Sequence, residues 1–355
     1  MTNAETFRPP MHLNGDPADR YLGVAYNFHL QGIQELNGAI TGEYPAKRAV
    51  LAGVATGQNI ALIGHPGTGK TELMEGVPQL ISDLRPDGVV WVPSQADLLP
   101  QRLVGGKASV TKEIKSGGKQ TIETTTSEIL AIVKPDTQFM IWDEASRMNP
   151  GAMNELLKAF ENRALVTDTG IVPLRELIGV ISALNPDERR QATFAIPCAV
   201  ASRHATGAIM GEENLGSTYY TNASGERHVG HPGIIRSAFL GIEKEPVKPI
   251  ITADALRMLS KFANKSVVVP EPVMHAVEGE IIPTAVTHLG DRGLAEGAGR
   301  IAAQSGRTAR MLALFEGRMI VNEADVREAA TMALVARVGM LQGISAAKEA
   351  SQVLR

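Results

Sequence analysis

A phosphate-binding loop stands out near the start of the sequence. Residues Gly64–Thr71 read GHPGTGKT and satisfy the pattern GxxxxGK[ST] at every required position. The glycines let successive backbone N–H groups point at one phosphate cluster, and the following helix adds its positive N-terminal end. In such loops the lysine contacts the β- and γ-phosphates, and the last hydroxyl binds Mg²⁺. We therefore expect a nucleotide to be bound by Gly64, His65, Pro66, Gly67, Thr68, Gly69, Lys70 and Thr71, with Thr71 also holding the metal.

Two acidic residues, Asp143 and Glu144, follow the apolar segment Phe139–Trp142. Open α/β sheets bind ligands at the carboxyl ends of their strands, so we expect this pair beside the phosphate-binding loop. Asp143 would hold Mg²⁺ through its water shell, and Glu144 would orient and polarise the attacking water. The combination predicts hydrolysis of a nucleoside triphosphate.

Two other classes of phosphate-loop protein fit less well. A GTPase should carry an Asn-Lys-x-Asp motif to read guanine, and Asn264–Val267 (NKSV) lacks the aspartate. A small-molecule kinase rarely needs a glutamate beside the magnesium-binding aspartate. The sequence therefore favours ATP hydrolysis over phosphoryl transfer to a metabolite.

Composition sets wider limits. The chain has 355 residues, 35 Lys+Arg, 38 Asp+Glu and a formal charge of −3, which argues against binding nucleic acid by bulk charge. The length predicts about two domains. The single cysteine, Cys198, excludes an internal disulfide framework and an all-cysteine metal site. No apolar run approaches the roughly 18 residues of a membrane helix, so we expect a cytoplasmic protein.

The elements that must position these residues alternate between strands and helices. Helices are expected from Pro45, from Lys70 and from Pro150, the last one capped by Asn149. This alternation predicts an α/β fold with a parallel sheet and helices on both faces. Four short apolar segments are expected to form buried strands: Asn59–Ile63, Val89–Val92, Phe139–Trp142 and Leu177–Ala183.

Other stretches interrupt this alternation. Gly105–Glu128 and Leu165–Val172 have the composition of β-hairpins, and the polar segment Gly211–Pro232 is expected to be a long loop. From Ile251 the pattern is helical and ends in an alanine-rich helix capped by Asn322. We therefore expect an N-terminal arm and weak helix over 1–40, a nucleotide-binding core over 41–245 and a smaller all-helical domain over 246–355.

The order of these motifs resembles that of the AAA+ ATPases and, within them, the MoxR family, over about Thr41 to Leu341. Asp97–Pro100 and the following hairpin resemble an insertion in the second core helix. Asp143–Pro150 resembles the family's extended Walker B segment, which continues here through Leu156–Arg163. Thr167–Ile171 resembles the hairpin before sensor 1. The resemblance implies a P-loop AAA+ core with hairpin insertions and a helical lid.

Further site residues follow from this resemblance. Ser182–Pro186 resembles the end of the sensor 1 strand, which makes Asn185 the residue that helps Glu144 to hold the water. Gly306–Arg310 resembles the start of the sensor 2 helix and implies that Arg310 contacts phosphate, within its own subunit or across an interface.

An arginine finger is also implied. In the family an Asp-Arg-Phe follows a Leu-Pro segment, whereas here Ile196–Pro197 leads to Ser202-Arg203-His204, so only the arginine matches. Arg203 is therefore the candidate for stabilising charge on a neighbouring subunit's ATP. Arg147 and Arg163 are the alternatives.

The resemblance implies a ring, expected to be hexameric, that uses ATP and Mg²⁺ to remodel or activate a partner protein with a von Willebrand factor A domain. Two alternatives remain open. One is an AAA+ motor or loader acting on DNA, which would need the hairpin lysines to face a pore. The other is a monomeric nucleotide-binding switch. The hairpin lysines are Lys107, Lys112, Lys115 and Lys119.

Overall fold

The computed structural model describes most of the chain. It covers residues 17–40, 42–116, 119–167, 170–185, 193–211, 219–221, 227–229, 246–294 and 298–354, with the backbone alone for 106–129, 219–221 and 227–229. The first 16 residues of the predicted arm and most of the predicted loop Gly211–Pro232 lie outside these ranges.

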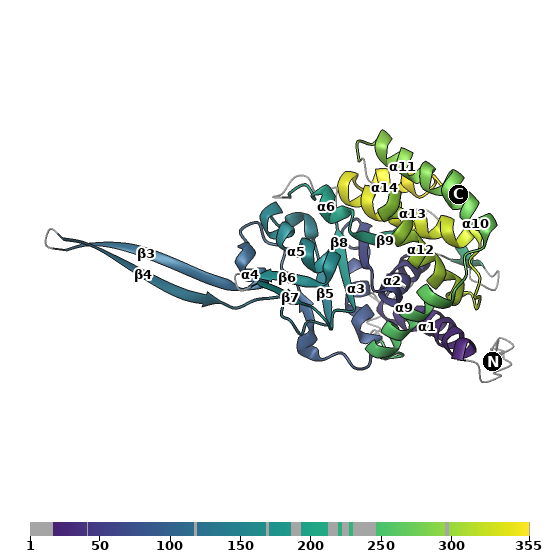
Figure 1. Ribbon diagram of the computed structural model, residues 1–355, viewed down its shortest axis with the longest axis horizontal. Helices are drawn as coiled ribbons and strands as arrows, with labels where there is room; N and C mark the ends of the chain where they lie inside the picture. Colours follow the sequence, from purple (N-terminus) through teal and green to yellow (C-terminus); the bar gives the residue numbers. More distant parts are fainter. Residues whose placement is uncertain are drawn as a thin grey trace.

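A parallel five-stranded sheet forms the centre of the fold, in the order β2-β5-β8-β1-β9 (Figure 1). Side chains alternate across it: Ile60 and Leu62 of β1 join the apolar cluster on one face, and Ala61 and Ile63 join the cluster on the other. The strands are β1 (Asn59–Gly64), β2 (Val89–Trp91), β5 (Phe139–Trp142), β8 (Gly179–Leu184) and β9 (His204–Met210).

All four predicted strands are confirmed, with two corrections. The segment over β2 was expected to be buried, but β2 is an edge strand and Trp91 is 42% exposed. The fifth strand, β9, is not predicted, because its HATGAIM sequence includes Ala and Gly, both depleted in strands. Every residue of β9 is nevertheless buried, because β1 pairs with one side of it and helices cover its faces.

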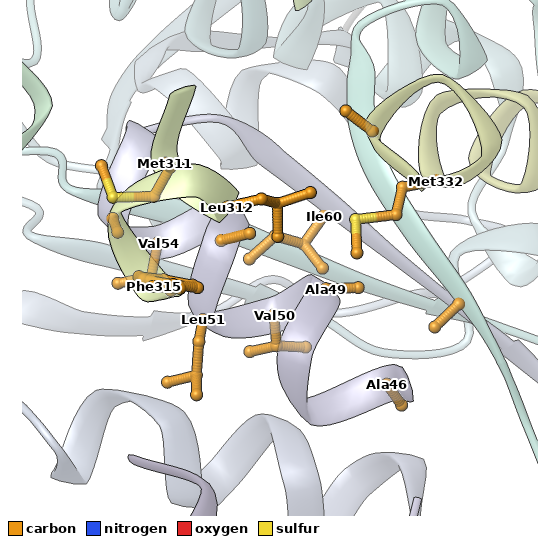
Figure 2. Close-up of a cluster of buried hydrophobic side chains, with 14 of the residues drawn as sticks. Ala46, Ala49, Val50, Leu51, Val54, Ile60, Met311, Leu312, Phe315 and Met332 are labelled. Carbon is orange, nitrogen blue, oxygen red and sulfur yellow. The ribbon is translucent and has the colours of Figure 1, made fainter. Parts of the chain in front are cut away.

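One face of the sheet is covered by α1, α2, α3, α9 and α12. One apolar cluster contains side chains of α2, Ile60 of β1, and Leu312 and Phe315 of α12 (Figure 2). Segments far apart in the sequence therefore share one core. The predicted weak helix is a full helix of 23 residues, α1. The bounds are α1 (Pro17–Ala39), α2 (Tyr44–Thr56), α3 (Lys70–Gln79), α9 (Ala253–Ser266) and α12 (Ala298–Phe315).

The opposite face carries α4, α5, α6, α13 and α14. The predicted caps are confirmed: Asn149 Oδ1 accepts the Ala152 N–H at 2.9 Å, and Asn322 and Asp325 form a capping box. The bounds are α4 (Pro100–Val104), α5 (Pro150–Asn162), α6 (Cys198–Ala201), α13 (Glu323–Gln342) and α14 (Ile344–Ala350).

The C-terminal helices pack directly on the sheet. A Cβ at Gly207 of β9 would lie 2.6 Å from Ala336 Cα, and a Cβ at Gly339 of α13 would lie 2.4 Å from Ile63 Cδ1. Glycine at both positions allows α13 to approach β1 and β9 this closely. The described residues also include α10 (Glu271–Ala276), a π-helical turn (Val277–Ile281), α11 (Ile282–Asp291) and two 3₁₀ turns (Pro86–Gly88 and Ala145–Arg147).

Both predicted hairpins are present. β3 (Gly106–Ser116) and β4 (Lys119–Ile129) form a long two-stranded arm that projects from the core, and β6 (Ala164–Thr167) pairs with β7 (Gly170–Pro173) near its base (Figure 1). A correction concerns the predicted loop Gly211–Pro232, which contains a short antiparallel pair, β10 (Tyr219–Thr221) and β11 (Arg227–Val229). Among the described helices, none is long and apolar enough to cross a membrane.

Candidate functional site

The phosphate-binding loop connects β1 to α3, as predicted. β1 ends at Gly64, and α3 begins at Lys70. Gly69 has a left-handed backbone (φ 84°), and a Cβ there would lie 2.1 Å from Ile40 Cδ1. Both the conformation and the close contact exclude other residue types without rearrangement. Ile40, at the end of α1, thus places an apolar side chain against the loop.

Lys70 is folded back into the loop. Its Nζ donates hydrogen bonds to the carbonyl oxygens of Gly64 at 2.8 Å and His65 at 2.7 Å. Thr68 Oγ1 donates to the same His65 carbonyl at 2.9 Å. The ammonium group is therefore held at the start of α3, where the helix end adds positive potential. This arrangement favours an anion at the mouth of the loop.

Thr71 and Asp143 meet beside the loop. Thr71 Oγ1 donates to Asp143 Oδ2 at 2.9 Å, and Asp143 Oδ1 accepts the Glu144 N–H at 2.8 Å. A hydroxyl and a carboxylate are hard oxygen donors, the type that Mg²⁺ prefers when it also binds substrate phosphates. These two residues therefore fit a magnesium ion.

Glu144 has an unusual backbone conformation. Its φ of 49° lies in the left-handed region, which is strained for a residue with a Cβ. Glu144 Oε1 forms an ion pair with Arg147 Nη2 at 3.1 Å, and both side chains are part-exposed. Arg147 is thus engaged with Glu144 of its own subunit.

Asn185 lies at the carboxyl end of β8, and it is the clearest polar anomaly of the site. The residue is buried, yet neither Oδ1 nor Nδ2 has a hydrogen-bond partner among the described residues. Buried amides are normally paired with protein or water, so such a group needs an explanation.

These residues surround one cavity of about 290 Å³ at the carboxyl ends of β1, β5 and β8. Gly64, His65 and Thr68 belong to the loop but not to the cavity wall, and they form its supporting hydrogen bonds. The cavity is lined by Pro66, Gly67, Gly69, Lys70, Thr71, Glu72, Asp143, Glu144, Leu184 and Asn185.

The predicted arginines lie outside this cavity. Arg203 precedes β9, at the amino end of the strands, and its carbonyl accepts a hydrogen bond from Asn59 Nδ2 at 2.9 Å. Arg163 Nη2 donates to the Gly57 carbonyl at 2.5 Å, and burial lowers the pKa of Arg163 to about 10. Arg310 Nη1 donates to the Gly306 carbonyl at 3.0 Å on α12.

A second, larger cavity of about 710 Å³ lies where α6 meets the C-terminal helices. Three arginines from separate segments line it: Arg203, Arg300 of α12 and Arg337 of α13. Arg300 Nη1 donates to Ser202 Oγ at 2.6 Å, and Arg337 Nη1 donates to the Ala333 carbonyl at 3.0 Å. Sequence reasoning missed Arg300 and Arg337, because only the packing of α12 and α13 brings them to Arg203.

Comparison with known families agrees with this geometry. Residues 59–196 match the AAA domain of the dynein-related subfamily, and residues 295–354 match the AAA lid domain. The protein joins an AAA core to an AAA lid. The AAA core match contains the phosphate-binding loop, Asp143, Glu144 and Asn185, and the lid match contains Arg300, Arg310 and Arg337. The AAA+ architecture expected from the order of motifs is confirmed.

Among the individual proteins that resemble the chain are one of known structure and one from a virus. The crystal structure of a candidate ATPase from Cytophaga hutchinsonii superposes with a TM-score of 0.66 and 21% identity, over 95% of this chain and 96% of the other. That likeness supports the shared fold of the AAA core and lid. "Structural protein ORF618" of Acidianus two-tailed virus is 37% identical over 86 residues, which are 22% of this chain and 14% of the viral protein.

Proposed function

We propose that the protein hydrolyses ATP with Mg²⁺ in the cavity between the phosphate-binding loop and Asp143. The observation that carries this proposal is the position of Asn185, whose two buried amide atoms have no partner among the described residues of a cavity shared with Lys70, Asp143 and Glu144. An amide in that position can bind and orient a water molecule beside a carboxylate base.

Each residue then has a defined role. Lys70 leaves the loop carbonyls to contact the β- and γ-phosphates, while the loop N–H groups bind the same anion. Thr71 and Asp143 would hold the magnesium ion, which would neutralise charge on the phosphates when bound. Glu144 accepts a proton from the attacking water at a carboxylate oxygen, and Asn185 fixes the direction of that water. Ile40 supplies an apolar contact beside the loop.

The finger residue acts across an interface in this proposal. A parallel strand of seven residues spans roughly 20 Å, so Arg203 at its amino end cannot reach the cavity of its own subunit. Arg203 therefore acts on the ATP of a neighbour, where such fingers contribute about 10³–10⁵ in rate. Arg310 does not line the cavity of its own subunit either, and we propose that its phosphate contact also crosses an interface.

We further propose that the subunits form a ring of the MoxR type, hexameric by this analogy, that remodels or activates a partner protein. Because α13 packs on β1 and β9, core and lid of one subunit move together, and hydrolysis at an interface rotates whole subunits against each other. The projecting β3–β4 arm is suited to contact the partner (Figure 1). A von Willebrand factor A domain is the proposed partner type.

The ATPase rate per subunit, measured against protein concentration from nanomolar to tens of micromolar, tests this function. We expect the rate to rise and then saturate as rings form, with sizing chromatography on the same samples showing assembly. A constant rate from a single subunit would contradict the ring and leave a monomeric nucleotide-binding switch.

The alternative of a motor or loader on DNA receives less support from the hairpin. In the β3–β4 register, Lys107 lies opposite Glu128 and Lys112 lies opposite Glu123, so part of its positive charge is balanced by acidic residues. Stimulation of the ATPase by duplex DNA that weakens steeply with salt would favour this alternative.

A further inference from the structure

Glu161, near the C-terminal end of α5, lies between two arginines of the larger cavity. Its Oε2 forms an ion pair with Arg203 Nη2 at 2.6 Å, and its Oε1 lies 3.9 Å from Arg300 Nη2. Glu161 lies within the AAA core match, Arg203 directly precedes the sheet strand β9, and Arg300 lies in the lid match. One carboxylate thus bridges the two domains at the proposed interface.

The two guanidinium groups are held from several sides. Arg203 Nη1 donates to the Ala199 carbonyl at 2.5 Å, while its Nε is buried without a partner among the described residues. Arg300 Nη1 is fixed by Ser202 Oγ, in the turn that carries Arg203. The Arg203 side chain is 15% exposed and that of Arg300 is 40% exposed, so part of each group remains open to solvent.

The charges of the arginines in the larger cavity explain why a carboxylate is needed between them. Arg203, Arg300 and the buried Arg337 line one cavity, and like charges this close repel each other. The hydrogen bond from Arg203 and the charges of Arg203 and Arg300 lower the pKa of the Glu161 carboxyl, so Glu161 is ionised at neutral pH. The negative charge allows two cations to stay close together.

We propose that Glu161 is a positioning residue, which holds Arg203 and Arg300 side by side so that both meet the phosphates of a neighbouring subunit's ATP. This inference rests on the proposed function. Glu161 itself does not touch the nucleotide. Glu161 fixes the orientation of the Arg203 guanidinium and holds Arg300 of the lid beside it. Both arginines are thereby positioned before the transition state forms.

The first test is the substitution Glu161→Gln, which keeps the size and removes the charge. We expect kcat to fall about 10- to 100-fold, with KM, nucleotide affinity and ring assembly unchanged, because only the alignment of the arginines is lost. Glu161→Asp, which retains the charge, should recover part of the rate. Glu155→Gln on the same helix, outside this cluster, is the control and should be fully active.

The second test mixes two variants with impaired activity. Lys70→Ala subunits lack a working ATP site but present intact arginines. Glu161→Gln subunits keep the ATP site but present misaligned arginines. Each interface joins the ATP site of one subunit to the arginines of its neighbour. In an equal random mixture, about a quarter of the interfaces therefore pair an intact ATP site with intact arginines, and activity should return at those interfaces.

The outcomes separate this inference from the proposed function. If Arg203→Ala mixed with Lys70→Ala regains activity but Glu161→Gln with Lys70→Ala does not, the role of Glu161 is wrong and the finger stands. Wild-type kcat in Glu161→Gln alone would also overturn the inference. If Arg203→Ala is itself fully active, the proposed action across the interface fails.

Discussion

Thr71 Oγ1 donates a hydrogen bond of 2.9 Å to Asp143 Oδ2, across 72 residues of sequence. The contact joins the first turn of α3 to the end of β5, the two segments that carry the predicted metal donors. It forms because β1 and β5 both pair with β8 in parallel, so their carboxyl ends open on the same edge of the sheet.

Replacing Lys70 with alanine should remove ATP binding. A charged hydrogen bond contributes about 1.5–3 kcal/mol, so we expect the affinity to fall about 10- to 150-fold for each phosphate contact that is lost. Titration with a fluorescent ATP analogue measures this directly. Unchanged affinity for ATP in the variant would contradict the assignment of Gly64–Thr71 as the phosphate-binding loop.

Glu144→Gln should bind ATP normally and hydrolyse it slowly. The amide cannot accept the proton of the attacking water, and loss of a general base costs about 10²–10⁴ in rate. Single-turnover hydrolysis, with nucleotide affinity measured in parallel, separates the two effects. Hydrolysis at the wild-type rate would remove Glu144 from the proposed mechanism.

Asn185→Ala should lower kcat about 10²- to 10³-fold, the usual cost of losing one preorganised polar contact at a reacting centre. Affinity for ATP should stay within about twofold, since the residue orients water rather than nucleotide. Asn154→Ala, on the exposed side of α5, provides the matched control. Steady-state kinetics measure kcat for both variants, and equal kcat values would contradict the role of Asn185.

Arg203→Ala should lose about 10³–10⁵ in kcat while binding ATP with unchanged affinity. The concentration dependence of the remaining rate should also disappear, because the residue supplied by the neighbour is gone. Arg257→Ala on α9 removes an arginine outside both cavities and serves as the control. A variant that loses ATP affinity together with kcat would point to a role within its own subunit.

Stability should fall below neutral pH because of His204. Complete burial lowers the pKa of His204 to about 4, and its ring nitrogens contact Ser182 Oγ and the Val200 carbonyl, both at 3.0 Å. Between about pH 6.5 and 4 the unfolded state binds more protons, so the free energy of unfolding decreases as the pH falls. This residue should contribute a loss of about 2 kcal/mol between pH 7 and 5.

Urea unfolding at pH 7 and pH 5 measures this effect. In His204→Gln, which cannot titrate, the difference between the two pH values should shrink by about that amount. A difference equal to that of the wild type would show that His204 is not the source of the pH dependence.

Local signals were sufficient for much of the fold. The glycines of the loop, the apolar runs of β1 and β5 and the cap at Asn149 each depend on neighbouring residues, so the sequence predicted them correctly. The composition of β9, with His204, Gly207 and two alanines, gives no such signal. That strand exists because β1 supplies its hydrogen bonds and α13 covers it.

The sequence by itself determined the chemistry proposed for one cavity: Lys70, Thr71, Asp143 and Glu144 stand at motif positions that specify phosphate and magnesium contacts. The tertiary structure alone decided the second cavity, where Arg203, Arg300 and Glu161 meet. The sequence predicts the first cavity and not the second because a motif fixes backbone geometry over only a few residues. The distance between α5, α6 and α12 depends instead on how the lid helices bury their apolar faces against the sheet.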